Sequence, residues 1–302
     1  MEEQFGGEIQ RIQWNNNIKS LWLSLYFILG IFFYVTIILA TVFAVIIAIG
    51  YAIDPENFFQ DFTNYELKPS NIYRIVKPYA KVFIFVSLAI MWFLKESLSD
   101  VGHFFSAQKL ELPHTDPFYK TLENMCIERG LTVPQIFIWS DTIFSDNDIA
   151  GAVVQDIQKR TSIVVSPATF RLPPDEMEAF IAQMVYRIYS KDVMFMSLLC
   201  FFGFFPDHLR HNMPKPVAKI FSPYLKLTNI VLSPIRNTIL NMRLGRSEIG
   251  AITLTRKKAP MAALLEKLTP LETVRIYFYD QYLPLFITKT DEEYRKALIR
   301  RA

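Results

Sequence analysis

Hydrophobic positions are distributed unevenly along this chain of 302 residues. No charged residue occurs from Ser20 to Ile53. A helix of this length would extend roughly 50 Å, against a bilayer core of about 30 Å. The run is also far longer than the apolar region of a cleaved signal peptide. The pattern therefore predicts a transmembrane helix over residues 20–53, preceded by an N-terminal tail over residues 1–19.

Two shorter apolar runs follow the first one. Val82–Leu94 lies between Lys81 and Lys95, whose long side chains can reach the two membrane surfaces and extend a span. This run predicts a second transmembrane helix over residues 79–98, joined to the first by residues 54–78; a buried or re-entrant segment is the alternative. Residues 193–205 form a run of similar length, which suits either a membrane-dipping segment or a core helix.

From about residue 99 onward the pattern becomes that of a folded α+β domain. Asp116 and Pro117 predict the start of a helix that Gly130 ends. Residues 133–139 predict a strand, and residues 149–157 with 160–165 predict a hairpin. Later helices are expected at 217–240, 243–255, 260–268 and after the capping box at 290–293. The expected domain, residues 99–302, is mostly helical with a small antiparallel sheet.

Composition and charge narrow the range of functions. Hydrophobic residues make up 51% of the chain, and its net charge is +3 without a concentrated basic stripe. Nucleic-acid binding is therefore not expected. The basic clusters at 256–258 and 300–301 fit solvated surfaces or contacts with anionic lipid headgroups. Cys126 and Cys200 supply neither a disulfide framework nor a paired metal motif.

The most informative segment is the helix predicted to start at Pro174. Its pattern is typical of a zinc-protease helix, in which H-E-x-x-H places two histidines on one face with a glutamate as general base. In this chain the corresponding positions hold Gln183, Met184 and Arg187. The helix therefore has the scaffold of a protease without its chemical groups.

The order of these elements resembles that of the HtpX-like membrane zinc metalloproteases, relatives of the CAAX prenyl proteases. The resemblance covers about residues 117–268 and rests on two quoted segments, G-L-T-V-P-Q-I-F-I at 130–138 and L-P-P-D-E-M-E-A-F-I-A at 172–182. It implies a zincin-like fold, and it implies a third zinc ligand in an E-x-x-x-D motif on a later helix. At those two positions the chain has Leu244 and Glu248.

These substitutions predict a catalytically inactive relative, a pseudoprotease without zinc, other cofactor or catalytic residue. Catalytic zinc requires three N, O or S ligands, and neither the cation of Arg187 nor the alkyl group of Leu244 can serve. Gln183 is a poor ligand, and Met184 cannot accept a proton from water. A structural replacement of the metal site is expected, in which Arg187 pairs with Glu248 and Gln183 hydrogen-bonds to the pair. The alternative places Arg187 in solvent or at a lipid headgroup.

Two other functions stay open from the sequence. Asp207, His208 and His211 are clustered potential ligands, and displaced coordination through them would give an active zinc metalloendopeptidase of membrane protein quality control. Alternatively, the chain is a membrane structural protein whose resemblance to proteases is superficial.

The expected role of the inactive relative is protein binding. An extended peptide could be added along the hairpin edge formed by Ile149, Ala150, Gly151 and Val153, because strand addition needs no metal. The expected partners are membrane lipid and a membrane or membrane-associated protein, for which the chain is a scaffold, adaptor or regulator in a homo- or hetero-oligomer. The apolar runs predict an integral protein of the inner or plasma membrane, and the resemblance implies a cytoplasmic large domain.

Overall fold

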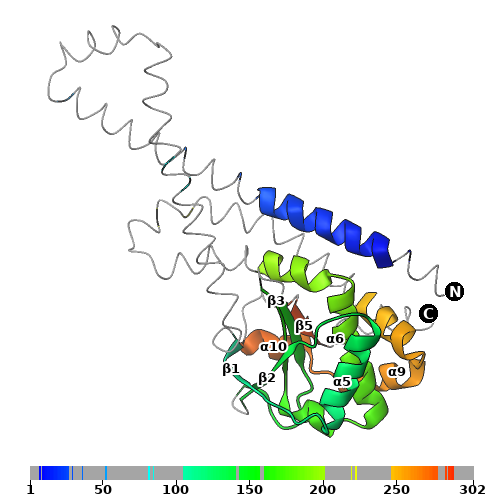
Figure 1. Cartoon of the computed structure of the whole chain (residues 1–302). Helices are drawn as coiled ribbons and strands as arrows, with labels where there is room; N and C mark the ends of the chain where they lie inside the picture. The colour runs from blue at the N-terminus through cyan, green and yellow to red at the C-terminus, as the bar shows by residue number, and fades with distance from the viewer. Residues whose placement is uncertain are drawn as a thin grey trace. The chain divides into compact units, whose positions relative to one another are not determined.

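The computed structural model of the chain forms two compact units, one of residues Met1–Leu23 with Lys95–Ala302 and one of Ser24–Leu94 (Figure 1). It describes residues 7, 9–26, 29, 36, 52, 81, 84, 105–140, 143–156, 160–200, 219, 222, 246–277, 283 and 285–288. In the second unit every described residue is helical. All named strands and helices belong to the first unit.

A five-stranded sheet forms the centre of the first unit, with the order β1-β2-β4-β3-β5. The strands are β1 Ala107–Lys109, β2 Gln135–Trp139, β3 Gly151–Gln155, β4 Thr161–Val165 and β5 Phe286–Ile287. The predicted hairpin is confirmed, since β3 and β4 pair antiparallel. The expectation of a purely antiparallel sheet was wrong, because β4 inserts between β3 and β2 and therefore runs parallel to β2.

Both faces of the sheet are covered. Ile163 and Val165 of β4 lie in the main hydrophobic core with the helices, whereas the alternate positions face a second, aromatic cluster. In that cluster Trp139 stacks on Phe286, with ring centroids 5.5 Å apart and planes 6° from parallel. Double-sided burial explains why each strand contains three consecutive apolar residues, Ala152–Val154 in β3 and Ile163–Val165 in β4.

Helix α5, Pro117–Glu128, forms where its end signals predict it. The Asp116 carboxylate accepts hydrogen bonds from the backbone N–H groups of Phe118 and Tyr119, which satisfies two donors that the helix start leaves open. After the helix, Gly130 adopts a φ of +64°, a conformation that glycine reaches at little cost. The predicted helix and both of its ends are confirmed.

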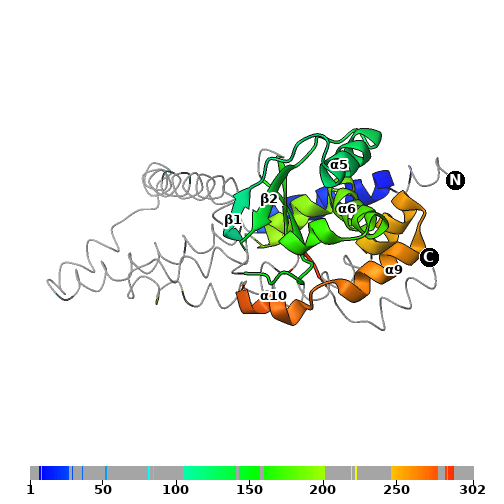
Figure 2. The ribbon, with the colours of Figure 1, turned by 90° about the horizontal axis from the view of Figure 1, so that it is seen from below.

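Helix α6, Pro174–Tyr189, packs against β3 and contacts α5 and also α9, Lys258–Lys267 (Figure 2). Its central half is buried on all sides, from Ala179 to Ile188. Further helices cover residues 192–200 and 246–255, and α10 spans Leu271–Tyr277. The predicted helices at 243–255 and 260–268 therefore exist in their described parts, while those at 217–240 and after Thr290 lie outside the described residues apart from residues 219 and 222.

The prediction of transmembrane helices was wrong. Among the described residues, no helix combines the length and apolar content that a bilayer crossing requires. This finding contradicts the membrane part of the expected fold class and the assignment as an integral membrane protein. Of the predicted spans, 20–53 and 79–98, only residues 20–26, 29, 36, 52, 81 and 84 lie within the described ranges. One physical reason is visible in the helix over residues 9–26, which contains the start of the first predicted span. That helix carries Arg11 and Lys19 and three consecutive asparagines at 15–17.

Most of the remaining residues of those runs lie outside the described ranges. For the third run, the described part belongs to the helix over residues 192–200. Its apolar side chains are buried within the protein; they are Val193, Phe195, Met196, Leu199 and Cys200. Of the two interpretations of residues 193–205, the described part matches a core helix.

Candidate functional site

The positions at which the sequence predicted a degenerate motif lie on the buried part of α6, Ala179–Ile188. Prolines at 173 and 174 and the acidic residues Asp175 and Glu176 start this helix, because Pro suits the first turn and carboxylates suit its positive end. Gln183 and Arg187 are four residues apart, about 40° around the helix axis, so they share one face. Gln183 is completely buried and Arg187 is 7% exposed. The alternative in which Arg187 faces solvent or a headgroup is therefore wrong.

The two polar side chains of this face are held by different parts of the chain. Gln183 Nε2 donates to Ser247 Oγ at 3.2 Å. The Arg187 guanidinium donates to the backbone carbonyl of Leu285 at 3.0 Å, immediately before β5. A hydrogen bond from a charged donor contributes about 1.5–3 kcal/mol. Arg187 therefore ties α6 to the C-terminal strand of the sheet.

The helix over residues 246–255 supplies the other side of this polar cluster. Ser247 and Glu248 are both completely buried on it. The helix approaches α6 closely at Gly250, where an added Cβ would lie 2.3 Å from two atoms of the Tyr186 ring. The contacts at Gly250 and Ser247 bring the Glu248 helix against the Arg187 helix. The specific Arg187–Glu248 ion pair stays a prediction.

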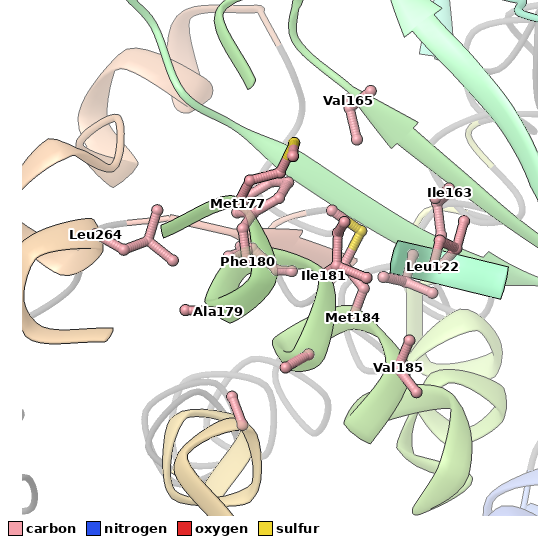
Figure 3. Packing of buried hydrophobic residues seen from close by; sticks show 14 of the residues in the cluster. Leu122, Ile163, Val165, Met177, Ala179, Phe180, Ile181, Met184, Val185 and Leu264 are labelled. Atoms are coloured by element: carbon pink, nitrogen blue, oxygen red, sulfur yellow. The ribbon is translucent and has the colours of Figure 1, made fainter. Parts of the chain in front are cut away.

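Met184, at the position of the general base, belongs to the apolar core. It is completely buried, and its Cε would lie 3.2 Å from a Cβ added at Gly151 of β3. Figure 3 shows Met184 among the apolar side chains of α6 and the neighbouring elements, with Phe180 and Ile181 nearby. A carboxylate at this position would be buried without water, so the surroundings suit a thioether and not a base.

The zinc that the resemblance implies does not fit these residues. The buried guanidinium of Arg187 offers five donors and no lone pair, and its charge repels a divalent cation. Gln183 Oε1 is buried and makes no hydrogen bond among the described residues, but one amide oxygen falls short of three ligands. Across the described ranges, no group of three His, Cys, Asp or Glu side chains could hold a metal. Leu244, Asp207, His208 and His211 lie outside those ranges.

The predicted peptide-binding edge is not an open edge over most of its length. Ile149 forms a parallel bridge with Leu268, and its carbonyl accepts from the Thr269 N–H at 2.9 Å. Ala150 points the other way, since its backbone exchanges hydrogen bonds with Ser166 on the β4 side of the hairpin.

Gly151 and Ala152 then pair with Ile287 and Phe286 of β5. The prediction failed because it treated the hairpin as the end of the sheet. A strand more than a hundred residues later in the sequence covers the side of β3 that was expected to be free. Of the predicted peptide-binding residues, Gly151 pairs with β5, Ile149 is bridged to Leu268, and Val153 lies beyond the residues that β5 covers.

A groove of about 490 Å³ lies between α5, the start of α6 and the end of the helix over residues 246–255, and sequence reasoning did not identify it. Its charged and amide side chains are Asn124, Glu128, Arg129, Asp175 and Glu178. Val185, which also lines the groove, is two residues from Gln183 and Arg187 and therefore on the opposite face of α6. The groove is thus separate from the degenerate motif.

Lys257 lies beside this groove and bridges two acidic residues of α6. Its Nζ donates to Asp175 at 2.7 Å and to Glu178 at 2.8 Å. These hydrogen bonds, first that with Asp175, raise the pKa of Lys257. Lys257 therefore contacts the protein's own carboxylates, whereas the sequence suggested solvent or a lipid headgroup. The only sequence signal for this bridge was the pair of acids at 175 and 178, one turn apart on α6.

Cys126 is a core residue, as its place on the apolar face of α5 predicts. Burial raises the pKa of its thiol to about 11. At neutral pH it is therefore an uncharged, inaccessible thiol and not a nucleophile.

No family model, curated protein or solved structure matches this chain. The resemblance to the HtpX-like proteases therefore stays a prediction that rests on the residues quoted for it.

Proposed function

We propose that this chain is a catalytically inactive relative of the HtpX-like zinc metalloproteases that acts by binding another protein, as a scaffold, adaptor or regulator. The observation that best supports the proposal is the buried guanidinium of Arg187, which donates to the Leu285 carbonyl at 3.0 Å. In a working enzyme of this type a neutral imidazole would stand there and face a metal ion.

The neighbouring positions support the same interpretation. Gln183, which replaces the first histidine, donates to Ser247. Met184, which replaces the general base, is packed in the apolar core. Each of the three positions thus has a structural contact suited to its present side chain. Hydrolysis by this type of site depends on metal, ligated water and base together, so their joint replacement removes the main sources of rate acceleration.

A peptidase assay on the purified full-length chain tests the inactivity. The substrates are an unfolded protein and a library of fluorogenic peptides, each with added zinc. The proposal predicts no cleavage above that of a preparation treated with a metal chelator. A variant that carries Gln183→His, Met184→Glu, Arg187→His and Leu244→Glu is the matched comparison. Zinc-dependent cleavage by the natural chain, lost on substitution of His208 or His211, would establish the displaced-ligand protease instead.

A further inference from the structure

The helix over residues 9–26, the blue helix of Figure 1, exposes large apolar side chains, although polar side chains are buried beside Ile9 on its inner face. Trp14, Leu21 and Trp22 are 66%, 69% and 65% exposed. The polar side chains Asn16 and Ser20, in contrast, are buried against the rest of the first unit. A surface helix of a globular protein normally buries its apolar stripe and exposes its polar one. The outer face of this helix therefore has the character of an interface.

Specific hydrogen bonds hold the helix in this orientation. Gln13 Nε2 donates to the Tyr189 carbonyl at 2.7 Å, at the end of α6. Asn16 Nδ2 donates to the Ser190 carbonyl at 2.9 Å and to the Asp192 carboxylate at 2.7 Å. These contacts fix the rotation of the helix about its axis, so its apolar face is a preorganised surface and not a fluctuating one.

The apolar face is large enough for specific binding. A tryptophan side chain contributes about 200 Å² when it is buried, so two-thirds exposure leaves roughly 130 Å² available on each one. Together with Leu21 the exposed area is roughly 400 Å², within the range of about 300–600 Å² at which surface patches are often functional.

The spacing and the charges indicate what covers this face. Trp14, Ile18 and Leu21 follow one another at intervals of four and three residues, the repeat of a seam between two helices. Asn15 and Asn17 border the seam, which keeps it narrow. The charged residues of the 9–26 segment are Arg11 and Lys19, both basic and exposed.

From these observations we infer that the outer face of the 9–26 helix binds an amphipathic helix of another protein, whose apolar stripe is flanked by carboxylates. The inference rests on the proposed binding role and names its surface and the kind of partner. The face also includes the exposed Leu25 and Tyr26, but a lipid-binding helix would carry more basic residues than Arg11 and Lys19. A second copy in parallel pairing would place Arg11 and Lys19 against like charges.

The test uses the full-length chain and a labelled synthetic peptide of about 20 residues, longer than the ~12–15 residues below which isolated helices are marginal in water. The leucines of this peptide are spaced alternately four and three residues apart, and glutamates flank them. A second peptide has lysines in place of the glutamates. Fluorescence anisotropy is expected to show binding of the glutamate peptide by the natural chain. The combined substitution Trp14→Ala, Leu21→Ala and Trp22→Ala should weaken it by at least about 30-fold, the effect of losing one strong interface anchor.

Charge reversal distinguishes specific binding at this surface from nonspecific hydrophobic adsorption of the peptide. Arg11→Glu with Lys19→Glu should weaken binding of the glutamate peptide and strengthen binding of the lysine peptide, whereas Asn15→Ala with Asn17→Ala, which leaves the seam intact, should change neither. Every side chain replaced in these variants is exposed. The variants and the natural chain should therefore have the same thermal melting temperature.

Other results would overturn the inference. Absence of peptide binding by the natural chain, or equal binding by the triple variant, contradicts it. Self-association in sedimentation that the triple variant abolishes would identify a second copy as the occupant, and co-sedimentation with anionic vesicles that the variant abolishes would identify lipid. None of these readouts depends on peptidase activity or zinc, so failure here leaves the proposed inactivity to its own test.

Discussion

Substitution of Gly250 by alanine tests the close contact on which the polar cluster depends. A Cβ at this position would lie 2.3 Å from Cδ2 and Cγ and 2.4 Å from Cε2 of the Tyr186 ring. Tyr186 is 4% exposed in the interface of the two helices, so its ring has little room to move away. The two helices must therefore separate or the ring must leave its rotamer.

The expected magnitude is a balance of two effects. Overpacking of a buried site costs about 1–3 kcal/mol, and three ring atoms at these distances place this site near the upper limit. Alanine in place of glycine in a helix contributes about 1 kcal/mol in the opposite direction. The net expected loss in the free energy of unfolding is about 2 kcal/mol.

Urea unfolding, followed by tryptophan fluorescence, measures this loss. Gly7→Ala is the matched control, since Gly7 is helical and an added Cβ would meet nothing within 4 Å. The control should be neutral or slightly stabilising. In a double-mutant cycle, prior replacement of Tyr186 by alanine should remove most of the Gly250→Ala cost. An unchanged or increased stability of Gly250→Ala would refute the helix contact and, with it, the placement of Glu248 beside α6.

Three further predictions concern other buried groups. Arg187→Met should lower the free energy of unfolding by about 1.5–3 kcal/mol, because it removes a charged donor from the buried Leu285 carbonyl. Arg160→Met, at a 58% exposed side chain, should cost less than about 1 kcal/mol in the same urea titration. Asn16→Ala should cost about 1.5–3 kcal/mol, since the Asp192 carboxylate loses its amide donor, and exposed Asn15→Ala should be nearly neutral. For Cys126 the folded pKa of about 11 lies above the ordinary thiol value of 9.0, so the unfolded chain ionises first and stability should fall between about pH 9 and 11. Cys126→Ala should not show that part of the fall, and an identical pH profile in both chains would contradict the assignment.

Local signals explain why parts of the fold were predictable. The ends of α5 are encoded by Asp116, Pro117 and Gly130, all within reach of the helix backbone itself. The start of α6 is likewise set by its own prolines and acids. The β3–β4 hairpin joins neighbouring segments, so its pairing follows from two adjacent apolar runs and a short connection.

Long-range pairing explains what the sequence did not reveal. The coverage of Gly151 and Ala152 by β5 depends on residues 286 and 287, whose two-residue strand carries no distinctive pattern. The parallel pairing of β2 with β4 likewise depends on which side of β4 the strand β3 occupies. The first fact changed the functional interpretation, because β5 covers part of the edge where peptide binding was expected.

The candidate site was predictable in position but not in its contacts. Helical spacing placed Gln183 and Arg187 on one face, and both are buried there. The partners Ser247 and Leu285 come from segments that no periodicity connects to α6. The membrane prediction failed for a different reason, since it weighed the apolar run after Ser20 and not the polar residues of the helix that leads into it.

The zinc content of the purified full-length chain tests the central claim most directly. Elemental analysis after mild dialysis without chelator gives the ratio of metal to protein. The variant with Gln183→His, Met184→Glu, Arg187→His and Leu244→Glu is prepared and measured in parallel. Less than about a tenth of an equivalent of zinc is expected in the natural chain, because the buried Arg187 stands where the proposed relationship to proteases would require a zinc ligand. Near-stoichiometric zinc that survives dialysis would contradict the account and direct attention to His208 and His211 as ligands.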